Sequence, residues 1–231
     1  DRLGHKFRDV LGEDGIGYID VMQSAASRMQ VLINDLLKFS RLACDPEKFK
    51  EVKLNDIIEE CLNDLDVSIE QEKAAINTGD LPVLECIPGQ MRQLFQNLIS
   101  NALKFHKKDE HPVITIGADI RTGRSLPGIS PALAHQRFCR ITVQDNGIGF
   151  NEQYLDKIFV VFQRLHGRLE YQGTGIGLAV CKKIVDNHHG FITAASSENE
   201  GATFIIILPV RQEYGSSEKT GKENQDSHGR R

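Results

Sequence analysis

Two amide side chains and one ammonium group are spaced to share a face of a predicted helix. Within residues 94–105 (LFQNLISNALKF), Asn101 follows Asn97 by four residues and Lys104 lies three further on, which places them on one side of a helix. An amide oxygen can bind Mg²⁺, and amide and ammonium N–H groups can bind phosphate oxygens. This face could therefore hold a metal–triphosphate, although, taken alone, the helix is better explained by a solvated polar face.

A carboxylate followed by glycines ends a predicted strand. In residues 144–150 (QDNGIGF), Asp145 is followed by Gly147 and Gly149. The carboxylate can accept a hydrogen bond from an exocyclic amine such as that of adenine, and the glycines would let the backbone pass close to the base. Asn-Gly after a strand is also a strong hairpin signal, so a plain turn is the alternative.

A second glycine cluster opens an amphipathic helix. Residues 173–178 (GTGIGL) could present backbone N–H groups and the positive end of the helix to phosphate oxygens. The cluster is not a P-loop, because no Lys-Ser/Thr pair follows its last glycine. It is not a dinucleotide-binding turn either, because Leu178 replaces the third glycine and no strand precedes it. Turn glycines without a ligand are the alternative.

The chain after residue 48 alternates between strand and helix patterns, which favours a layered α/β or α+β domain. The predicted helices are 55–73, 89–107 and 176–187. The predicted strands are 51–54, 75–78, 83–87, 113–120, 138–144, 191–196 and 203–210. Residues 121–136, rich in Gly, Pro and Ser, form an inserted loop. The tail from residue 211 has almost nothing apolar to bury, so we expect it to be disordered.

The N-terminal part has a different sequence pattern. Residues 18–42 contain no Pro or Gly, and apolar residues recur at three- and four-residue steps, which is typical of helix-on-helix packing. These positions are Ile19, Met22, Ala26, Met29, Ile33 and Leu36. With residues 1–11 as the end of a partner helix, we expect a helical hairpin that dimerises into a bundle. The alternative is a helix that lies on the following domain.

Composition excludes several classes of protein. The 231 residues carry a net charge of −4 with no basic stripe, which argues against nucleic-acid binding. The longest apolar run, residues 204–210, is too short to span a bilayer. Five widely spaced cysteines without C-x-x-C indicate buried thiols in a reducing cytoplasm. His106, His111, His188 and His189 lack metal-ligand spacing and are expected to have solvated structural roles.

The order of these motifs resembles the sensor histidine kinases of the GHKL group of ATPases. Their N, G1, F, G2 and G3 boxes correspond to the Asn-bearing helix, the Asp145 turn, residues 158–162 (IFVVF), the cluster 173–178 and residues 201–204 (GATF). Residues 36–42 (LLKFSRL) look like the second helix of the family's dimerisation and phosphotransfer hairpin. The implied fold is α+β, with a four-helix-bundle hairpin (1–46), a Bergerat-type α/β sandwich (47–211) and a tail (212–231).

The resemblance implies a role for each motif residue. Asn101 would hold Mg²⁺, Asn97 and Lys104 would contact the phosphates during catalysis, and Asp145 would bind adenine. Gly147 and Gly149 would flank the base, and Phe162 would anchor a lid over residues 163–172. The phosphates would be framed by Gly173, Thr174, Gly175, Ile176, Gly177 and Leu178. Arg164, His166 and Arg168 in the lid are further candidates, with mobile surface charge the better explanation of the last two.

One position indicates transfer rather than hydrolysis. Hydrolytic members of the superfamily carry a Glu four residues before the metal-binding Asn, where it can activate water. Here that position is Asn97, and an amide cannot take a proton near neutral pH. ATP would therefore be kept for a better-placed nucleophile, as a phosphotransferase requires.

Two positions depart from the family pattern. The phosphorylated His is expected in a His-Asp/Glu motif followed by Pro. His5 lacks both neighbours, so we reject it and expect the acceptor to lie upstream of residue 1. Asn199 stands where the third box usually opens with Gly, and Asn tolerates the left-handed backbone that this turn needs.

The resemblance implies an ATP:protein-histidine phosphotransferase that relays phosphate to an aspartate of a response-regulator receiver domain. We expect a homodimer that uses ATP and Mg²⁺, with no nucleic-acid partner and no membrane segment in this chain. The location would be cytoplasmic, with membrane tethering of the full-length protein left open. The alternative is a non-catalytic ATP-binding dimerisation scaffold; a hydrolytic clamp ATPase is disfavoured by Asn97.

Overall fold

The computed structural model describes residues 8–42, 48–126, 129–165 and 173–212. A long helix, α2 (Arg8–Arg41), precedes a mixed domain. The helices of that domain are α3 (Leu54–Asp64), α4 (Asp66–Glu72), α5 (Pro88–Lys104), α6 (Leu155–Ile158) and α7 (Gly177–Asn187). Its strands are β1 (Lys50–Lys53), β2 (Ala75–Thr78), β3 (Val83–Cys86), β4 (Val113–Thr122), β5 (Arg137–Asp145), β6 (Phe191–Ser197) and β7 (Gly201–Pro209).

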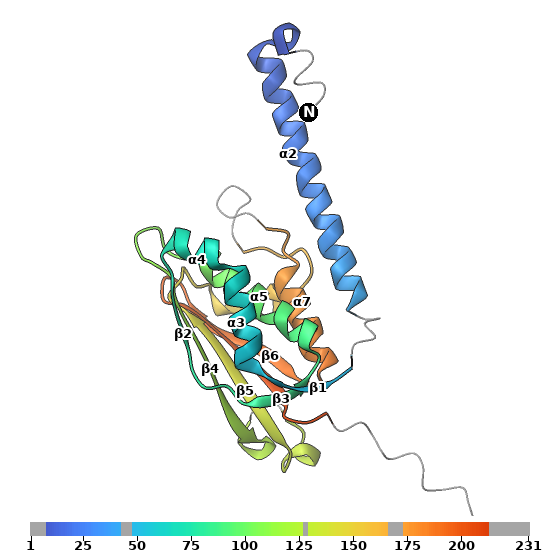
Figure 1. Cartoon of the computed structure of the whole chain (residues 1–231), viewed down its shortest axis with the longest axis vertical. Helices are drawn as coiled ribbons and strands as arrows, with labels where there is room; N and C mark the ends of the chain where they lie inside the picture. Colours follow the sequence, from blue (N-terminus) through green and yellow to red (C-terminus); the bar gives the residue numbers. More distant parts are fainter. Residues whose placement is uncertain (1–7, 43–47, 127–128, 166–172, 213–231) are drawn as a thin grey trace, which may run out of the picture.

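Five strands form the main sheet in the order β2-β4-β5-β7-β6. The β2–β4 pair is parallel and the other pairs are antiparallel. Strands β1 and β3 form a separate antiparallel pair. Helices α3, α5 and α7 lie together over one face of the sheet (Figure 1). The predicted α/β sandwich is confirmed.

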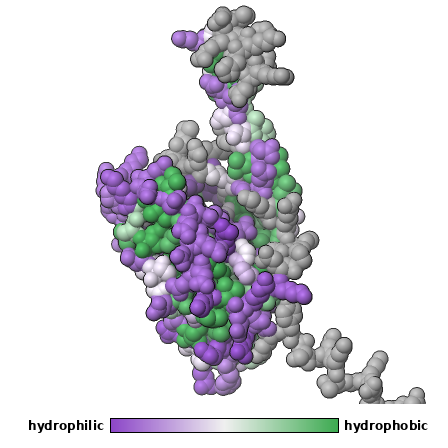
Figure 2. All heavy atoms as spheres, viewed as in Figure 1, coloured by the Kyte–Doolittle hydropathy of each residue, from purple (hydrophilic) through white to green (hydrophobic). Residues whose placement is uncertain are grey.

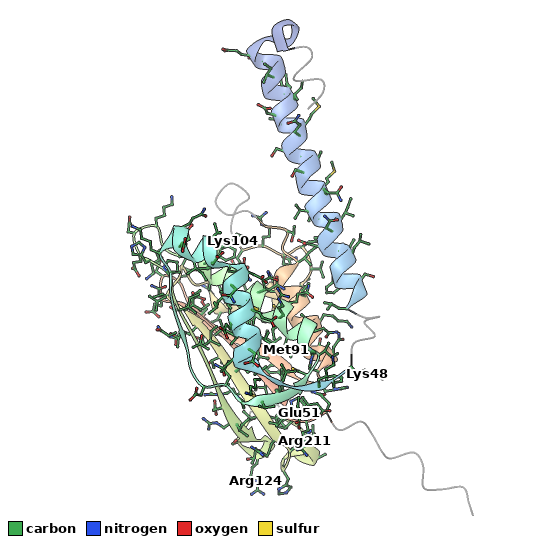
Figure 3. The ribbon with its side chains drawn as sticks, viewed as in Figure 1. Lys48, Glu51, Met91, Lys104, Arg124 and Arg211 are labelled. Carbon is green, nitrogen blue, oxygen red and sulfur yellow. The ribbon has the colours of Figure 1, made fainter. Side chains whose placement is uncertain are left out.

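Helix α5 is the centre of the core. Its apolar stripe, including Leu94, Phe95 and Leu98, is at most 1% exposed, and it packs with Ile141 of β5 and Ile184 of α7 in one large cluster. In Figure 3, α5 runs from Met91 in the middle of the domain to Lys104 at its upper end. The burial of one stripe fixes the direction in which the opposite, polar stripe of α5 points.

The loop between β4 and β5 folds back on the sheet. Two single-turn 3₁₀ helices, Gly123–Ser125 and Pro131–Leu133, bring Leu126 and Ile129 against Phe138 and Ile207 on the face opposite the main core. The inserted loop predicted at 121–136 therefore covers a patch of the outer sheet face with its own small apolar cluster.

Helix α2 is a stem whose apolar residues are largely uncovered. Its backbone breaks at Gly12 (φ 63°), so residues 8–11 form a short helical piece before the long one, as expected for a hairpin. Figure 1 shows the stem rising from the domain, and Figure 2 shows apolar residues on its surface. The large apolar side chains of the stem that are at least 47% exposed are Tyr18, Val21, Met22, Met29, Val31, Ile33, Leu36 and Leu37.

The alternative prediction, a helix lying on the following domain, holds for the lower end of the stem. Phe39 packs against the main cluster and Leu42 is 6% exposed within it. Asn187 of α7 donates a hydrogen bond from Nδ2 to the Leu42 carbonyl at 2.9 Å. No helix within the described residues combines the length and apolarity needed to cross a membrane.

Three details differ from the prediction. The helix expected at 55–73 breaks at Leu65 into α3 and α4, and the short helix α6 was not anticipated. Gln212, which we placed in the tail, is 8% exposed, and its backbone N–H donates to Glu85 Oε2 at 2.7 Å. This contact ties Gln212 to the domain, while the rest of the expected tail lies outside the described residues.

Candidate functional site

A cavity of about 430 Å³ lies between α5, the loop before α7 and the ends of β5 and β7. One part of its lining is apolar and includes Phe105, Ile148, Phe150, Ile158, Leu178 and Phe204. Another part is polar and includes Asn97, Ser100, Asn101, Lys104 and Thr174. A cavity with apolar and polar parts suits a ligand that has a flat ring at one end and charge at the other.

The polar face of α5 supplies the three residues that the sequence singled out on this helix. Asn97, Asn101 and Lys104 all line the cavity, because the opposite stripe of α5 is buried in the core. A Cβ atom placed on Gly177 would lie 3.4 Å from Asn97 Oδ1, so the Asn97 amide lies directly against the first turn of α7. Side chain and helix N-terminus together form one surface of hydrogen-bond donors.

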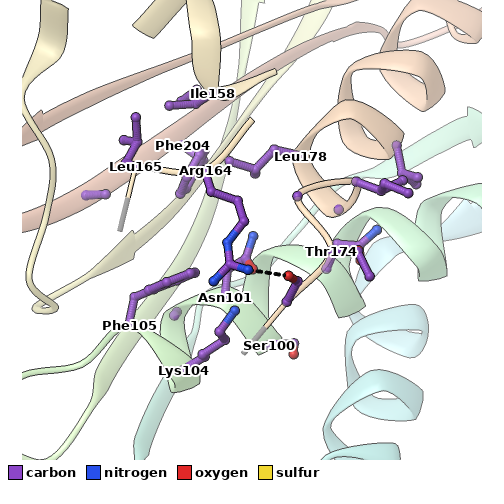
Figure 4. Close-up of a pocket in the computed structure, with 18 of the residues that line it drawn as sticks. Ser100, Asn101, Lys104, Phe105, Ile158, Arg164, Leu165, Thr174, Leu178 and Phe204 are labelled. Atoms are coloured by element: carbon purple, nitrogen blue, oxygen red, sulfur yellow. Dashed lines mark hydrogen bonds between the residues drawn. The ribbon is translucent and has the colours of Figure 1, made fainter. Parts of the chain in front are cut away.

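Two cations converge on the glycine cluster. A Cβ atom placed on Gly173 would lie 2.6 Å from Lys104 Nζ, and Arg164 donates from Nη1 to the Gly173 carbonyl at 3.0 Å. Lys104 Nζ also lies 4.3 Å from the centroid of the Phe105 ring. Figure 4 shows the Arg164 and Lys104 side chains pointing toward one another across the cavity. Burial first, and then the charge of Arg164, lowers the pKa of Lys104. A polyanionic ligand would favour the charged form of Lys104 and so act against both effects on its pKa. The two cations therefore make this part of the cavity suitable for negative charge.

The glycine cluster requires its glycines where it turns. Gly175 has φ 74°, and a Cβ atom there would lie 2.7 Å from the Gln163 carbonyl oxygen. Its own carbonyl accepts a hydrogen bond from the Phe162 N–H at 3.0 Å. The loop is therefore held close to residues 162–164, with Thr174 facing the cavity.

Asp145 is held by the backbone at the other part of the cavity. Its Oδ1 accepts from the N–H groups of Gly147 (2.9 Å) and Ala202 (3.2 Å). Burial raises the pKa of Asp145, and these two hydrogen bonds act against that rise. Both hydrogen bonds that Asp145 accepts from the described residues go to Oδ1, so the other carboxylate oxygen is available to a ligand there. Gly147 lies behind Asp145, where a Cβ atom would come within 2.4 Å of the Phe105 carbonyl oxygen.

Most of the motif residues meet at this cavity. Beside the three residues of α5, its lining includes Asp145, Gly149, Gly173, Thr174, Gly175, Ile176, Gly177 and Leu178. Gly147 supports the site from behind. Asn199 has φ 64° and donates to the Ile148 carbonyl at 2.7 Å, which confirms the left-handed turn expected there.

Phe162 is an exception. Its side chain is 56% exposed and does not line the cavity. Phe159, in the same box, packs against the main cluster instead. Phe162 has a positive φ of 66°. Its role as the anchor of a lid stays a prediction, because residues 166–172 of that lid lie outside the described residues. His166 and Arg168 lie outside the described residues.

Several lining residues were missed. Gln93 and Gln96 line the cavity together with Ser100. Gln93 lies four residues before Asn97, and Ser100 lies four residues before Lys104 and four after Gln96. The same helical spacing could therefore have predicted all three. Asp35 of the stem also lines the cavity, where it accepts a hydrogen bond from Thr174 Oγ1 at 2.7 Å. No local pattern in the sequence signals that contact.

His188 corrects a further prediction. We expected a solvated side chain, but His188 is fully buried. Its Nε2 lies 3.0 Å from the Ile87 N–H and its Nδ1 lies 2.8 Å from the Ile184 carbonyl. Because the backbone N–H needs an acceptor and the carbonyl needs a donor, the ring is neutral with its proton on Nδ1. His188 thereby joins the start of α5 to the end of α7.

The cysteines follow the prediction. Cys61, Cys86, Cys139 and Cys181 are free and buried, and Cys44 lies outside the described residues. Burial raises the pKa of Cys61 to about 11 and of Cys86 and Cys139 to about 12, so these thiols are not nucleophiles near neutral pH. Across the described ranges, no group of three or more His, Cys, Asp or Glu is placed to hold a metal ion.

The mixed sheet, the single helical layer and a cavity between an Asn-bearing helix and a glycine-rich helix start define an ATP-binding domain of the GHKL class. A model of the family described as histidine kinase-, DNA gyrase B-, and HSP90-like ATPase matches residues 86–212. The chain belongs to this family, and it carries a catalytic domain of the histidine-kinase type.

Comparisons with individual proteins support the same family. The chain is 36% identical over 208 residues to the phytochrome-like protein Cph1 of Synechocystis sp., covering 90% of this chain and 26% of that protein. It thus spans about a quarter of that relative's length. The structure of full-length ShkA in complex with AMPPNP contains a region with the same fold (TM-score 0.63, 20% identity, covering 86% of this chain and 39% of that chain). So does histidine kinase ThkA in complex with the response regulator protein TrrA (TM-score 0.58, 22% identity, 84% and 51% coverage).

Proposed function

We propose that this chain binds Mg-ATP and transfers its γ-phosphoryl group to a protein histidine, from which an aspartate of a response regulator receives it. The observation that carries the proposal is the pairing of the Asn97 amide with the first turn of α7 at the polar part of the cavity. This surface can bind phosphates but offers no carboxylate at the position of Asn97 to activate water.

In this proposal each part of the cavity has one task. The free oxygen of Asp145 accepts a hydrogen bond from the adenine amine, while Ile148, Phe150 and Phe204 cover the faces of the ring. Lys104 and Arg164 neutralise phosphate charge. The loop and helix start at residues 173–177 donate backbone hydrogen bonds. Phosphoryl transfer depends mainly on such positioning and charge neutralisation.

The donor set also fits Mg²⁺. The Asn101 amide is an oxygen ligand at the polar part of the cavity, and Mg²⁺ commonly combines few protein oxygens with phosphate oxygens and water. Asn101 would hold the ion, which would supply further charge neutralisation. This arrangement predicts that Mg²⁺ binds together with the triphosphate rather than before it.

The transfer itself needs a nucleophile from outside the cavity. A neutral imidazole nitrogen forms the new bond to phosphorus as the bond to the ADP oxygen breaks, and ADP leaves with the bonding electrons. Among the histidines of this chain, none has the motif of the acceptor, and His188 is buried in a structural role. We therefore place the acceptor on a segment that this chain does not include.

Two further parts of the proposal concern partners and location. The exposed apolar side chains of the stem, such as Met29 and Ile33, support a homodimer through α2. The complex of ThkA with TrrA supports a response regulator as partner. Free buried cysteines and the use of ATP support a cytoplasmic location for this domain.

The test is calorimetric titration with a non-hydrolysable ATP analogue, with and without Mg²⁺. We expect Asp145→Ala to weaken binding more than tenfold, and Asn101→Ala to remove the Mg²⁺ dependence while leaving metal-free binding. Asp119→Ala is the matched control, because Asp119 pairs with Arg140 on the sheet and does not line the cavity. A folded chain that binds no analogue would refute the proposal.

A further inference from the structure

The last two turns of the stem reach the nucleotide cavity. Leu42 and Phe39 are fixed in the core, and Asn187 at the end of α7 donates to the Leu42 carbonyl. Seven residues earlier, Asp35 lies at the other end of α7 and lines the cavity. The lower stem is therefore held to α7 by hydrogen bonds at two points, one far from the cavity and one in its wall.

The contact in the wall uses the phosphate-binding loop. Thr174 Oγ1 donates to Asp35 Oδ2 at 2.7 Å, and Thr174 stands between Gly173 and Gly175. Both side chains are half-buried. Asp35 and Asp145 are the two carboxylates among the described residues that line the cavity. The Asp145 carboxylate is held by backbone N–H groups, whereas the Asp35 carboxylate lies beside the loop that faces the polar part.

The charges around this loop favour one anion and oppose a second. Lys104 and Arg164 converge on Gly173 from the cavity side, so a carboxylate on the neighbouring Thr174 is favourable when the cavity holds no phosphate. Phosphates bound at the same loop bring several negative charges close to that carboxylate. Like charges in a partly buried site repel, because little water lies between them.

On this basis, and resting on the proposed function, we propose that Asp35 is a nucleotide-discriminating residue. Its carboxylate and the phosphates of the nucleotide compete for the Thr174 loop. Docking of the lower stem and binding of a highly charged nucleotide therefore oppose one another. By linkage the effect is reciprocal: a nucleotide that weakens the Asp35 contact also loosens the stem, and a docked stem weakens nucleotide binding by the same factor.

The test is calorimetric titration of wild type, Asp35→Asn and Asp20→Asn with Mg-ATP and Mg-ADP. Asp35→Asn keeps an oxygen that can accept from Thr174 but removes the charge. Asp20 is an exposed carboxylate on the same helix, so Asp20→Asn makes the same change of net charge away from the cavity. We expect Asp35→Asn to tighten ATP about fivefold or more, and ADP by a smaller factor. The difference should shrink at high salt, because screening weakens repulsion.

A second measurement checks the contact without nucleotide. The ¹³C resonance of the Thr174 methyl group should shift in Asp35→Asn and stay in place in Asp20→Asn. An unmoved resonance, or equal ATP affinities of the two variants with binding intact, would overturn this inference and leave the proposed function standing. A folded wild-type chain that binds neither nucleotide would overturn the proposed function and this inference with it.

Discussion

Helices α2 and α5 are both amphipathic, but they differ in what covers their apolar stripes. The stripe of α5 is buried by the sheet and by α3 and α7, with Leu94 and Phe95 fully inaccessible. On the stem, Met29 and Ile33 are more than half exposed, whereas Phe39 and Leu42, at its lower end, pack in the main cluster. The domain is thus complete within one chain, whereas the stem still presents a surface that could pack on another helix.

The largest expected effect tests whether the domain is self-sufficient. Phe95→Ala removes a fully buried ring and should lower the free energy of unfolding by about 3–5 kcal/mol. At protein concentrations low enough to keep the chain monomeric, Met29→Ala should change it by less than about 0.5 kcal/mol, because the Met29 side chain is 58% exposed in one chain. Urea unfolding followed by circular dichroism measures both. Equal losses would mean that the stem contributes to the same core.

The next prediction asks whether the domain can be made to use ATP without a protein acceptor. Asn97→Glu places a carboxylate where it can activate water, so steady hydrolysis should rise at least about 100-fold. Asn97→Gln keeps the amide and serves as the control. Phosphate release is the measurement, and an Asn97→Glu rate no higher than that of Asn97→Gln would mean that the position does not face the reacting phosphate.

A third prediction addresses the uncovered stem. Ile33→Lys puts a charge into the exposed apolar stripe and should weaken self-association at least about tenfold. Ser27→Lys adds the same charge at an exposed polar position of the helix and should have little effect. Sedimentation equilibrium distinguishes the two. A monomeric wild-type chain would remove the dimer from the proposal.

The smallest expected effect concerns pH and lies entirely within the domain. Burial lowers the pKa of His188, with the Ile184 carbonyl opposing this and the charge of His189 adding to it. Because the folded state disfavours the proton, the stabilisation is complete above the ordinary histidine pKa of about 6.5. It is lost as pH falls below that value, by at most about 1.4 kcal/mol per pH unit for one proton.

Urea unfolding at several pH values between 5 and 8 measures this loss. His188→Gln should flatten the pH dependence. His189→Gln, at the exposed neighbouring ring, should weaken it only slightly, because the charge of His189 lowers the pKa of His188 less than burial does. A dependence that survives in His188→Gln would assign it to other groups.

The parts of the fold that depend on local pattern could be predicted from the sequence. Strand β2 has the bounds 75–78 that were expected, and the polar face of α5 points into the cavity because its spacing fixes the buried stripe. The left-handed turn at Asn199 follows from the residue type itself. These features depend on periodicity and on backbone preference, which neighbouring residues determine.

The parts of the fold that depend on distant contacts could not be predicted from the sequence. The buried His188 ring accepts a hydrogen bond from the Ile87 N–H, 101 residues away in the sequence. Asp35 meets Thr174 across 139 residues, and Gln212 is fixed by Glu85. Phe162 and Phe159 carry the same side chain, and only the fold decides which one enters the core. Tertiary packing, rather than propensity, determines each of these outcomes.

The length of the stem has a mechanical consequence. Leu42 is fixed in the core. Measured from Leu42 along the axis of α2, Asp35 lies about 10 Å away and Tyr18 about 36 Å away. A tilt of about 6° moves the far end by roughly 4 Å and Asp35 by roughly 1 Å. One ångström is enough to stretch the 2.7 Å contact with Thr174 beyond hydrogen-bond length. A displacement of roughly 4 Å at Tyr18 would therefore be enough to break the contact between Asp35 and the phosphate-binding loop.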